Sequence, residues 1–320
     1  MRPFRLLALI LLTVLAFSAC TWKGGSADNT PVPTEAAPSE TPWDETPDAE
    51  ATFRRSTLYY LSDEGFLVPV TKLIPWEEGI AKACLSYMIG TESNEREAAK
   101  LGLRTVIPSG AELSLAISER NATVNITGLE PLPDAGAELD MLEAIVNTLT
   151  EFSTVDTVTV TVEGEGGRLK HGTELPVKRG AYPLNPETDE LETLQGAMPV
   201  TLYFPNSSGA VTVPVTRYMQ KTPTVYSLAR ALIDGARVRG LRSCFPENTL
   251  LLGAAIENGT VTVNLSEDFR SVAETEGLYS LACSTLGLTL AESYDFGRLV
   301  IQVNGEVFAP ETFSPPESVN

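Results

Sequence analysis

The sequence predicts an α+β protein made of two tandem two-layer sandwich domains. The first observation is an internal duplication: VPVT occurs at residues 68–71 and 213–216, and ATVNIT at 122–127 corresponds to VTVNLSEDF at 261–269. The matched segments keep their order in both halves of the chain, which indicates one supersecondary unit copied once. The second observation is that both copies contain the same succession of strand-like and helix-like segments. Each copy is long enough to bury a core of its own.

Each copy is predicted to begin with a β-hairpin. Segments with strand periodicity flank turn-forming residues there, which is typical of a hairpin. We expect paired strands at 57–61 and 66–71 in the first copy, and at 200–204 and 210–216 in the second.

After the hairpin, each copy is predicted to continue as helix, strand, strand, helix, strand (α-β-β-α-β). Apolar residues recur at helical spacing. An amphipathic helix has one apolar face to cover, so both helices of a copy are expected to lie against a single sheet. The expected helices are at 80–88 and 139–149, then 225–233 and 278–285; the expected strands are at 112–118, 122–127 and 158–162, then 250–256, 260–265 and 299–303.

The strand VTVNL has a predicted register. Successive side chains of a strand point to opposite faces, so Val263 and Leu265 should be buried together while Thr262 and Asn264 point to the other face. Asn264 and its counterpart Asn125 begin Asn-x-Ser/Thr sequons. Their positions within alternating strands predict structural residues rather than glycan acceptors.

These motifs carry a resemblance to a known family. TLYY at 57–60, the two VPVT segments and VTVNLSEDF followed by a helix rich in small residues resemble the GerM domain of sporulation and spore-germination lipoproteins. The resemblance covers about 57–165 and 199–306, although TGLEP at 127–131 departs from SEDF at 266–269. It implies a non-enzymatic envelope protein of endospore formation that needs no cofactor. It also implies an α-β-β-α-β unit similar to the ring-building motif of sporulation channel proteins, which can assemble side by side into an oligomer.

The first residues predict export and a lipid anchor. Arg2 and Arg5 precede an apolar run at 6–17 that ends at Ser18-Ala19-Cys20, the layout of a signal peptide with a lipoprotein cysteine. Acyl chains on Cys20 would hold the protein on the outer face of the cytoplasmic membrane. The alternative is an ordinary secretory signal with an incidental cysteine. The predicted segments are a signal at 1–20, a disordered Pro/Thr/Glu-rich tether at 21–55, the first GerM domain at 56–180, a linker at 181–198, the second GerM domain at 199–312 and a disordered tail at 313–320.

One basic region interrupts an acidic chain. The net charge of −19 argues against nucleic-acid binding. Around the first helix of copy two, however, basic residues share a single acid, Asp234; they are Arg217, Lys221, Arg230, Arg237, Arg239 and Arg242. One interpretation is a solvated row of ion pairs. The other is a docking stripe, formed by Arg230, Arg237, Arg239 and Arg242, for an acidic protein or an anionic wall polymer.

The remaining reactive residues predict no catalytic or metal site. His171 is the single histidine, in a turn-like segment, and Glu267 with Asp268 follows Ser266 as in a capped turn. Cys84 and Cys283 lie on apolar helix faces, whereas the spacing leaves open a Cys244–Cys283 disulfide. We therefore expect a non-enzymatic interaction module whose partners are sporulation envelope proteins or peptidoglycan. The alternative is an enzyme acting on peptidoglycan or a solute-binding lipoprotein.

Overall fold

Two copies of one α+β unit make up the part of the chain that the structure describes. The computed structural model describes residues 53–75, 79–175, 183–187, 196–219, 222–309, 313–314, 316 and 319–320. All of them belong to one structural unit, Glu50–Asn320. The predictions for the signal, for Cys20, for most of the tether and for Lys221 lie outside the described residues.

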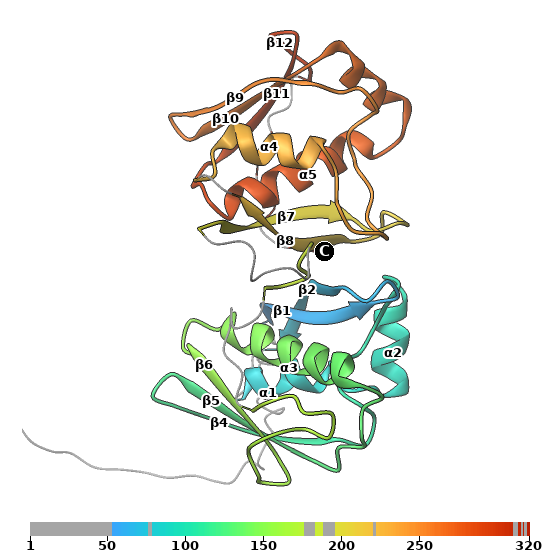
Figure 1. The fold of residues 1–320 in the computed structure, drawn as a ribbon, viewed down its shortest axis with the longest axis vertical. Helices are drawn as coiled ribbons and strands as arrows, with labels where there is room; N and C mark the ends of the chain where they lie inside the picture. Colours follow the sequence, from blue (N-terminus) through green and yellow to red (C-terminus); the bar gives the residue numbers. More distant parts are fainter. Residues whose placement is uncertain are drawn as a thin grey trace, which may run out of the picture. The chain divides into compact units, whose positions relative to one another are not determined.

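The element order follows the predicted order in both copies (Figure 1). Four short elements were not among the predicted strands and helices: α2, β3, η2 and β12. The first copy contains β1 (Phe53–Ser62), β2 (Leu67–Pro75), α1 (Ile80–Ser86), α2 (Glu92–Ala99), β3 (Leu103–Arg104), β4 (Glu112–Ser118), β5 (Asn121–Thr127), α3 (Ala135–Thr150) and β6 (Thr157–Val162). The second copy contains β7 (Met198–Pro205), β8 (Thr212–Met219), α4 (Val225–Ile233), β9 (Leu251–Glu257), β10 (Thr260–Leu265), the 3-10 helix η2 (Glu267–Glu274), α5 (Leu278–Ala291), β11 (Arg298–Val303) and β12 (Glu306–Val307).

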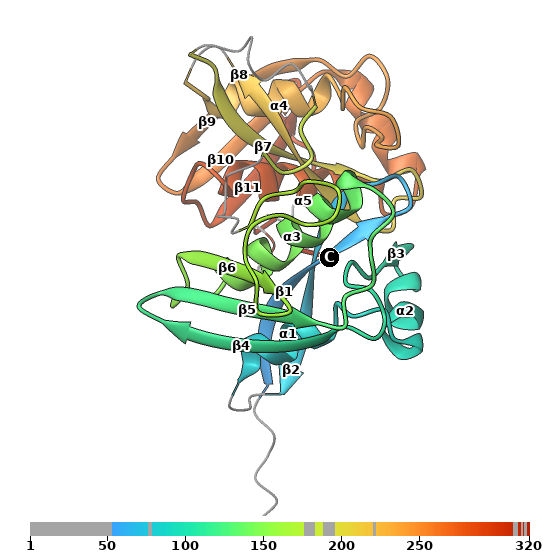
Figure 2. The same ribbon diagram turned by 60° about the horizontal axis from the view of Figure 1, so that its bottom comes forward.

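The α+β class is confirmed, and the hairpin adds a layer to it. In each copy an antiparallel pair and a parallel pair build the core of the main sheet, β4-β5-β6 or β9-β10-β11, and in the second copy β12 adds a short fourth strand beside β11 (Figure 2). The hairpins belong to separate sheets, and α3 and α5 contact β1 and β7 respectively. The helices therefore lie between the hairpin and the main sheet (Figure 1). This explains why α5 buries consecutive residues from Thr285 to Leu290: a helix covered on both faces is apolar all round.

A tyrosine at the same place in both copies hydrogen-bonds the hairpin to a helix, β1 to α3 and β7 to α5. The backbone N–H of Tyr203 donates to the buried Oγ1 of Thr289 at 3.0 Å, and the Tyr203 hydroxyl donates to Glu292 Oε1 at 2.8 Å. In the first copy, Tyr59 makes the same two bonds, to Thr148 at 3.1 Å and to Glu151 at 3.3 Å. The tyrosine shared by both hairpins thus fixes the hairpin layer on the helix layer.

The predicted register of the VTVNL strand is confirmed. Val263 and Leu265 have 0% exposure, whereas Thr262 and Asn264 are only partly buried. Asn264 Oδ1 accepts a hydrogen bond of 2.8 Å from the Gly305 N–H, and Asn125 accepts the same bond from Gly164. Both glycines have positive φ, so the repeated Asn and Gly residues together shape the turn after β11 and β6.

The structure differs from the predicted boundaries at three places. Strand β1 begins at Phe53, inside the predicted tether, and Glu187 of the predicted linker hydrogen-bonds to Thr216 of β8. Phe313 of the predicted disordered tail pairs with Leu299 in β11. Such short segments have no periodicity of their own, because their order comes from pairing with strands that are distant in the sequence.

The cysteines in the described part of the chain are free and buried, so the disulfide left open by the spacing is not formed. Cys244 Sγ lies 3.0 Å from Thr285 Oγ1. Burial raises the pKa of the Cys244 and Cys283 thiols to about 11. Both therefore act as small core residues and not as nucleophiles.

Candidate docking surface

The predicted basic region surrounds α4, and the local sequence explains where this helix begins. Thr224 and Ser227 form a capping box in which each side chain binds the backbone N–H of the other residue. This places Arg230 in the last turn of α4 and leaves Arg237 in the loop that follows. Arg217 enters the region from β8.

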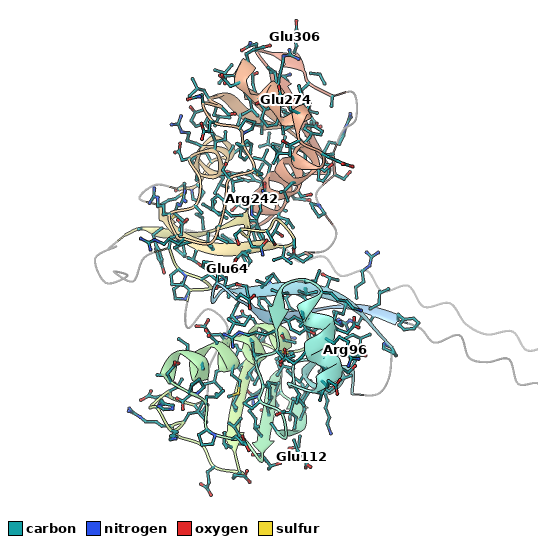
Figure 3. All side chains as sticks on the ribbon, turned by 90° about the vertical axis from the view of Figure 1, so that its right-hand side faces the viewer. Glu64, Arg96, Glu112, Arg242, Glu274 and Glu306 are labelled. Atoms are coloured by element: carbon teal, nitrogen blue, oxygen red, sulfur yellow. The ribbon has the colours of Figure 1, made fainter. Side chains whose placement is uncertain are left out.

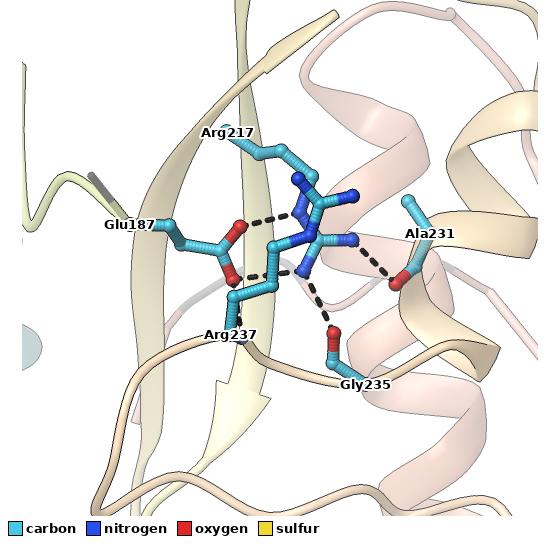
Figure 4. Close-up of polar contacts among 5 residues, drawn as sticks. All are labelled: Glu187, Arg217, Ala231, Gly235 and Arg237. Carbon is cyan, nitrogen blue, oxygen red and sulfur yellow. Dashed lines mark hydrogen bonds and ion pairs between the residues drawn. The ribbon is translucent and has the colours of Figure 1, made fainter. Parts of the chain in front are cut away.

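Arg217 is held in a buried ion pair with Glu187 (Figure 4). Both side chains are only 4% exposed. The guanidinium makes two bonds to the carboxylate, one of them Nη2 to Oε1 at 2.8 Å, and donates to the Ala231 and Gly235 carbonyls at 2.9 and 2.7 Å. The Arg217 guanidinium is buried and hydrogen-bonded within the protein, so Arg217 does not belong to an exposed docking stripe.

Arg230 and Arg237 lie at the surface beside this buried pair. Arg230 pairs with Asp234 at 2.8 Å, and the two side chains are 46% and 51% exposed. Arg237 uses its backbone N–H to bind Glu187 at 3.0 Å, while its side chain extends across the Arg217 guanidinium in Figure 4. Among the described residues, no carboxylate forms an ion pair with the Arg237 guanidinium. At this exposed position, the side chain therefore adds a positive charge that no described carboxylate pairs with.

A cavity of about 510 Å³ lies between these arginines. Its wall combines cationic groups with apolar and hydroxyl groups, and Tyr226 exposes 44% of its surface. Such a wall suits a ligand that carries both a negative charge and an apolar group. The lining residues are Arg217, Tyr218, Met219, Thr222, Thr224, Tyr226, Ser227, Arg230, Ala231, Asp234 and Arg237.

The structure separates the four arginines that the sequence placed in one stripe. Arg230 and Arg237 share the cavity, but Arg242 lines another one of about 390 Å³ near Leu278. Arg242 also covers Gly209, where any side chain would collide with its guanidinium. Arg239 is exposed and lines neither cavity. Helical spacing does not extend beyond Asp234, because the chain turns at Gly235 and Gly240, both with positive φ.

The other candidate residues from the sequence have structural contacts. Glu267 binds Asn304 at 2.9 Å and Arg270 at 2.7 Å, and Asp268 accepts a bond of 3.1 Å from the Ser266 hydroxyl. A His171 ring nitrogen lies 2.8 Å from the Leu132 carbonyl. Ser266 precedes η2 but makes no side-chain capping bond to it, so Glu267 and Asp268 are held by these side-chain contacts rather than by a cap.

Sequence reasoning missed two acids with perturbed titration on α3. Burial raises the pKa of Asp140 to about 6, and burial together with Asp140 raises the pKa of Glu143 to about 7. Perturbed acids are candidates for catalysis, but these two lie three residues apart on one helix and cannot face each other across a cleft. Asp140 lines a cavity of about 270 Å³ with Glu95, whose carboxylate binds the Thr105 hydroxyl.

The part of the chain that the structure describes contains neither a metal site nor a membrane-spanning helix. There, no group of His, Cys, Asp and Glu residues is arranged to hold a metal ion. No helix in these parts of the chain has both the length and the apolar character to cross a membrane.

Comparison with known proteins gives the family. A family model described as "Germane: Sporulation and spore germination" matches residues 57–167 and 201–308, which is more than half of the chain. Over 270 residues, covering 78% of this chain and 71% of the relative, the sequence is 26% identical to the spore germination protein GerM of Bacillus subtilis (strain 168). The solved tandem GerMN domains of Bacillus subtilis GerM have a similar fold, with a TM-score of 0.64 and 24% identity over 84% of this chain and 99% of that one. These matches confirm the resemblance found in the repeated motifs. The chain belongs to the Germane family of sporulation and spore germination proteins.

Proposed function

We propose that this protein is a non-enzymatic envelope lipoprotein that uses its second GerM domain to bind an acidic segment of another sporulation envelope protein. The observation that carries this proposal is the cavity beside α4. It brings the Arg237 guanidinium, which has no ion-pair partner among the described residues, next to Arg230 and the exposed Tyr226 ring, on a chain with a net charge of −19. Electrostatic complementarity of this kind favours selective association with an acidic partner.

Reversing the charge of Arg237 tests the docking surface. Arg237→Glu is expected to weaken partner association by about tenfold or more at low salt, with a smaller effect at high salt. Its melting temperature should remain nearly unchanged, because an exposed charge contributes little to stability. Partners would be crosslinked in sporulating cells, identified, purified and titrated against the wild-type and variant chains.

Arg239→Glu is the matched control for this experiment. It makes the same charge change two residues away, outside the cavity, and should weaken binding much less. Equal effects of the two substitutions would show that only general charge is sensed. Recovery of wall fragments without protein would identify peptidoglycan as the ligand, and turnover of purified peptidoglycan would disprove the non-enzymatic role.

The anchor on Cys20 is part of the same proposal. The Cys20→Ser chain should move from the membrane fraction to the soluble extracytoplasmic fraction, because the acyl chains would be lost. Circular dichroism of the released protein should match that of the wild type, since the described strands and helices begin at Phe53, well after Cys20. Continued membrane retention of the serine variant would exclude the lipid anchor.

A further inference from the structure

Strands β2 and β8 are edge strands of the two hairpins, and they contact each other across the two copies. An edge strand presents backbone N–H and C=O groups that need partners. In this chain, β2 and β8 do not form one continuous sheet. Two short segments provide the partners instead: Leu184-Asn185, which follows the first copy, and Val319-Asn320, which follows the second.

The Asn185 side chain binds both hairpins. Its Oδ1 accepts a bond of 2.9 Å from the Leu67 N–H, and its Nδ2 donates to the Leu67 carbonyl at 2.8 Å. The same Nδ2 donates to the Pro214 carbonyl of the other hairpin at 2.7 Å. A side-chain amide has one acceptor and two donor hydrogens, so these three bonds use it as a substitute for a strand.

Asn320 repeats this arrangement with the two hairpins exchanged. Its Oδ1 accepts from the Thr212 N–H at 2.7 Å, and its Nδ2 donates to the Thr212 carbonyl at 2.8 Å. The third bond joins Nδ2 to the Pro69 carbonyl at 2.8 Å. Both asparagines adopt the left-handed conformation, with φ of 44° for Asn185 and 52° for Asn320, a region in which Asn is favoured over most other residues.

The aliphatic residue before each asparagine provides the next pair of bonds. The Leu184 carbonyl accepts from the Thr216 N–H at 3.0 Å and from its hydroxyl at 2.8 Å. The Val319 carbonyl accepts from the Thr71 N–H and hydroxyl, both at 3.0 Å. The carbonyl of each aliphatic residue thus binds the hairpin of the copy that it does not follow, whereas each asparagine side chain binds both hairpins.

The spacing of these residues in the sequence indicates that the same set of contacts occurs twice. The receiving residues are 145 positions apart (67 to 212, 69 to 214 and 71 to 216), and the segments are 135 positions apart (184 to 319 and 185 to 320). The proline of each VPVT segment suits this arrangement. Proline has no N–H, so only its carbonyl needs a partner, and an asparagine side chain provides it. Both segments lie outside the ranges that the family model matches, 57–167 and 201–308.

We propose that the edge of each hairpin is a binding site for an aliphatic-Asn segment, and that each segment bridges the two hairpins and so locks the two copies together. Ser207 adds a contact at the same junction, because its hydroxyl donates to Glu64 Oε1 at 2.6 Å. Figure 3 shows Glu64 at the junction between the two copies. The hairpin edges β2 and β8 thus serve contacts within the chain. They are separate from the candidate docking site beside α4.

Residue-resolved hydrogen exchange of the full chain tests this lock. Asn185→Ala should speed exchange of the Leu67 amide by about tenfold or more and leave the Thr212 amide unchanged. Asn320→Ala should do the reverse. The double variant should speed both, while the amides of Tyr59 and Tyr203, which bond within their own copies, keep their protection.

Asn258→Ala is the matched control, because Asn258 also has a left-handed φ of 51° and is exposed in a turn. It should change none of these four amides. The proposal is overturned if either single variant affects Leu67 and Thr212 equally. It is also overturned if these two amides of the wild-type chain exchange as fast as amides of an unfolded peptide, a measurement that does not depend on any variant being folded.

Discussion

Replacing Arg217 with methionine is expected to lower the free energy of unfolding by about 3–5 kcal/mol. The substitution leaves the Glu187 carboxylate, 4% exposed, without its guanidinium partner. A buried charge without compensation is far more costly than the loss of an exposed pair. Urea denaturation followed by circular dichroism would measure the change.

Two further variants show whether the loss of stability comes from the unpaired buried charge. Arg230→Met breaks the exposed pair with Asp234 and should cost less than about 1 kcal/mol. The double variant Arg217→Met with Glu187→Gln should recover part of the stability, because it removes both charges. A single Arg217→Met chain as stable as Arg230→Met would contradict the buried pair.

Leu265→Ala is expected to lower the free energy of unfolding by about 2–5 kcal/mol through the cavity that it leaves. Leu265 is fully buried on β10, between the neighbouring strands β9 and β11. Thr262→Ala on the other face of the same strand is the control and should cost less than about 1 kcal/mol. A larger loss in the Thr262 variant would mean that the register is inverted.

The sequence was a good guide where each segment carries its own periodicity. The alternation in VTVNL predicted which side chains of β10 are buried, and the helical spacing predicted α4 and α5. It failed for α2, whose single buried residue, Ala98, leaves no apolar stripe to detect. The hairpin was predicted, but its place on the far side of the helices depends on long-range contacts such as Tyr203 with Thr289.

The candidate docking surface was predicted only in part. Charge composition identified the region, and Arg230 with Arg237 does line one cavity there. The partner of Arg217 could not be found, because Glu187 is 30 residues away in a segment without periodicity. Arg239 and Arg242 were grouped with the cavity residues because they lie near α4 in the sequence, but the chain leaves the helix at Asp234 and carries them away from the cavity.

The contacts that join hairpin and helix also determine the order in which this protein can fold. Tyr59 and Thr148 are separated by 89 residues, and Tyr203 and Thr289 by 86. Contacts so distant in sequence slow folding, because a long loop must close before they form. The edge of β2 can be covered only later, because Thr71 is 248 residues from the Val319 carbonyl that binds it. We expect a folding intermediate in which the first copy is complete but its edge is open, so that aggregation competes with folding until the second copy has been made.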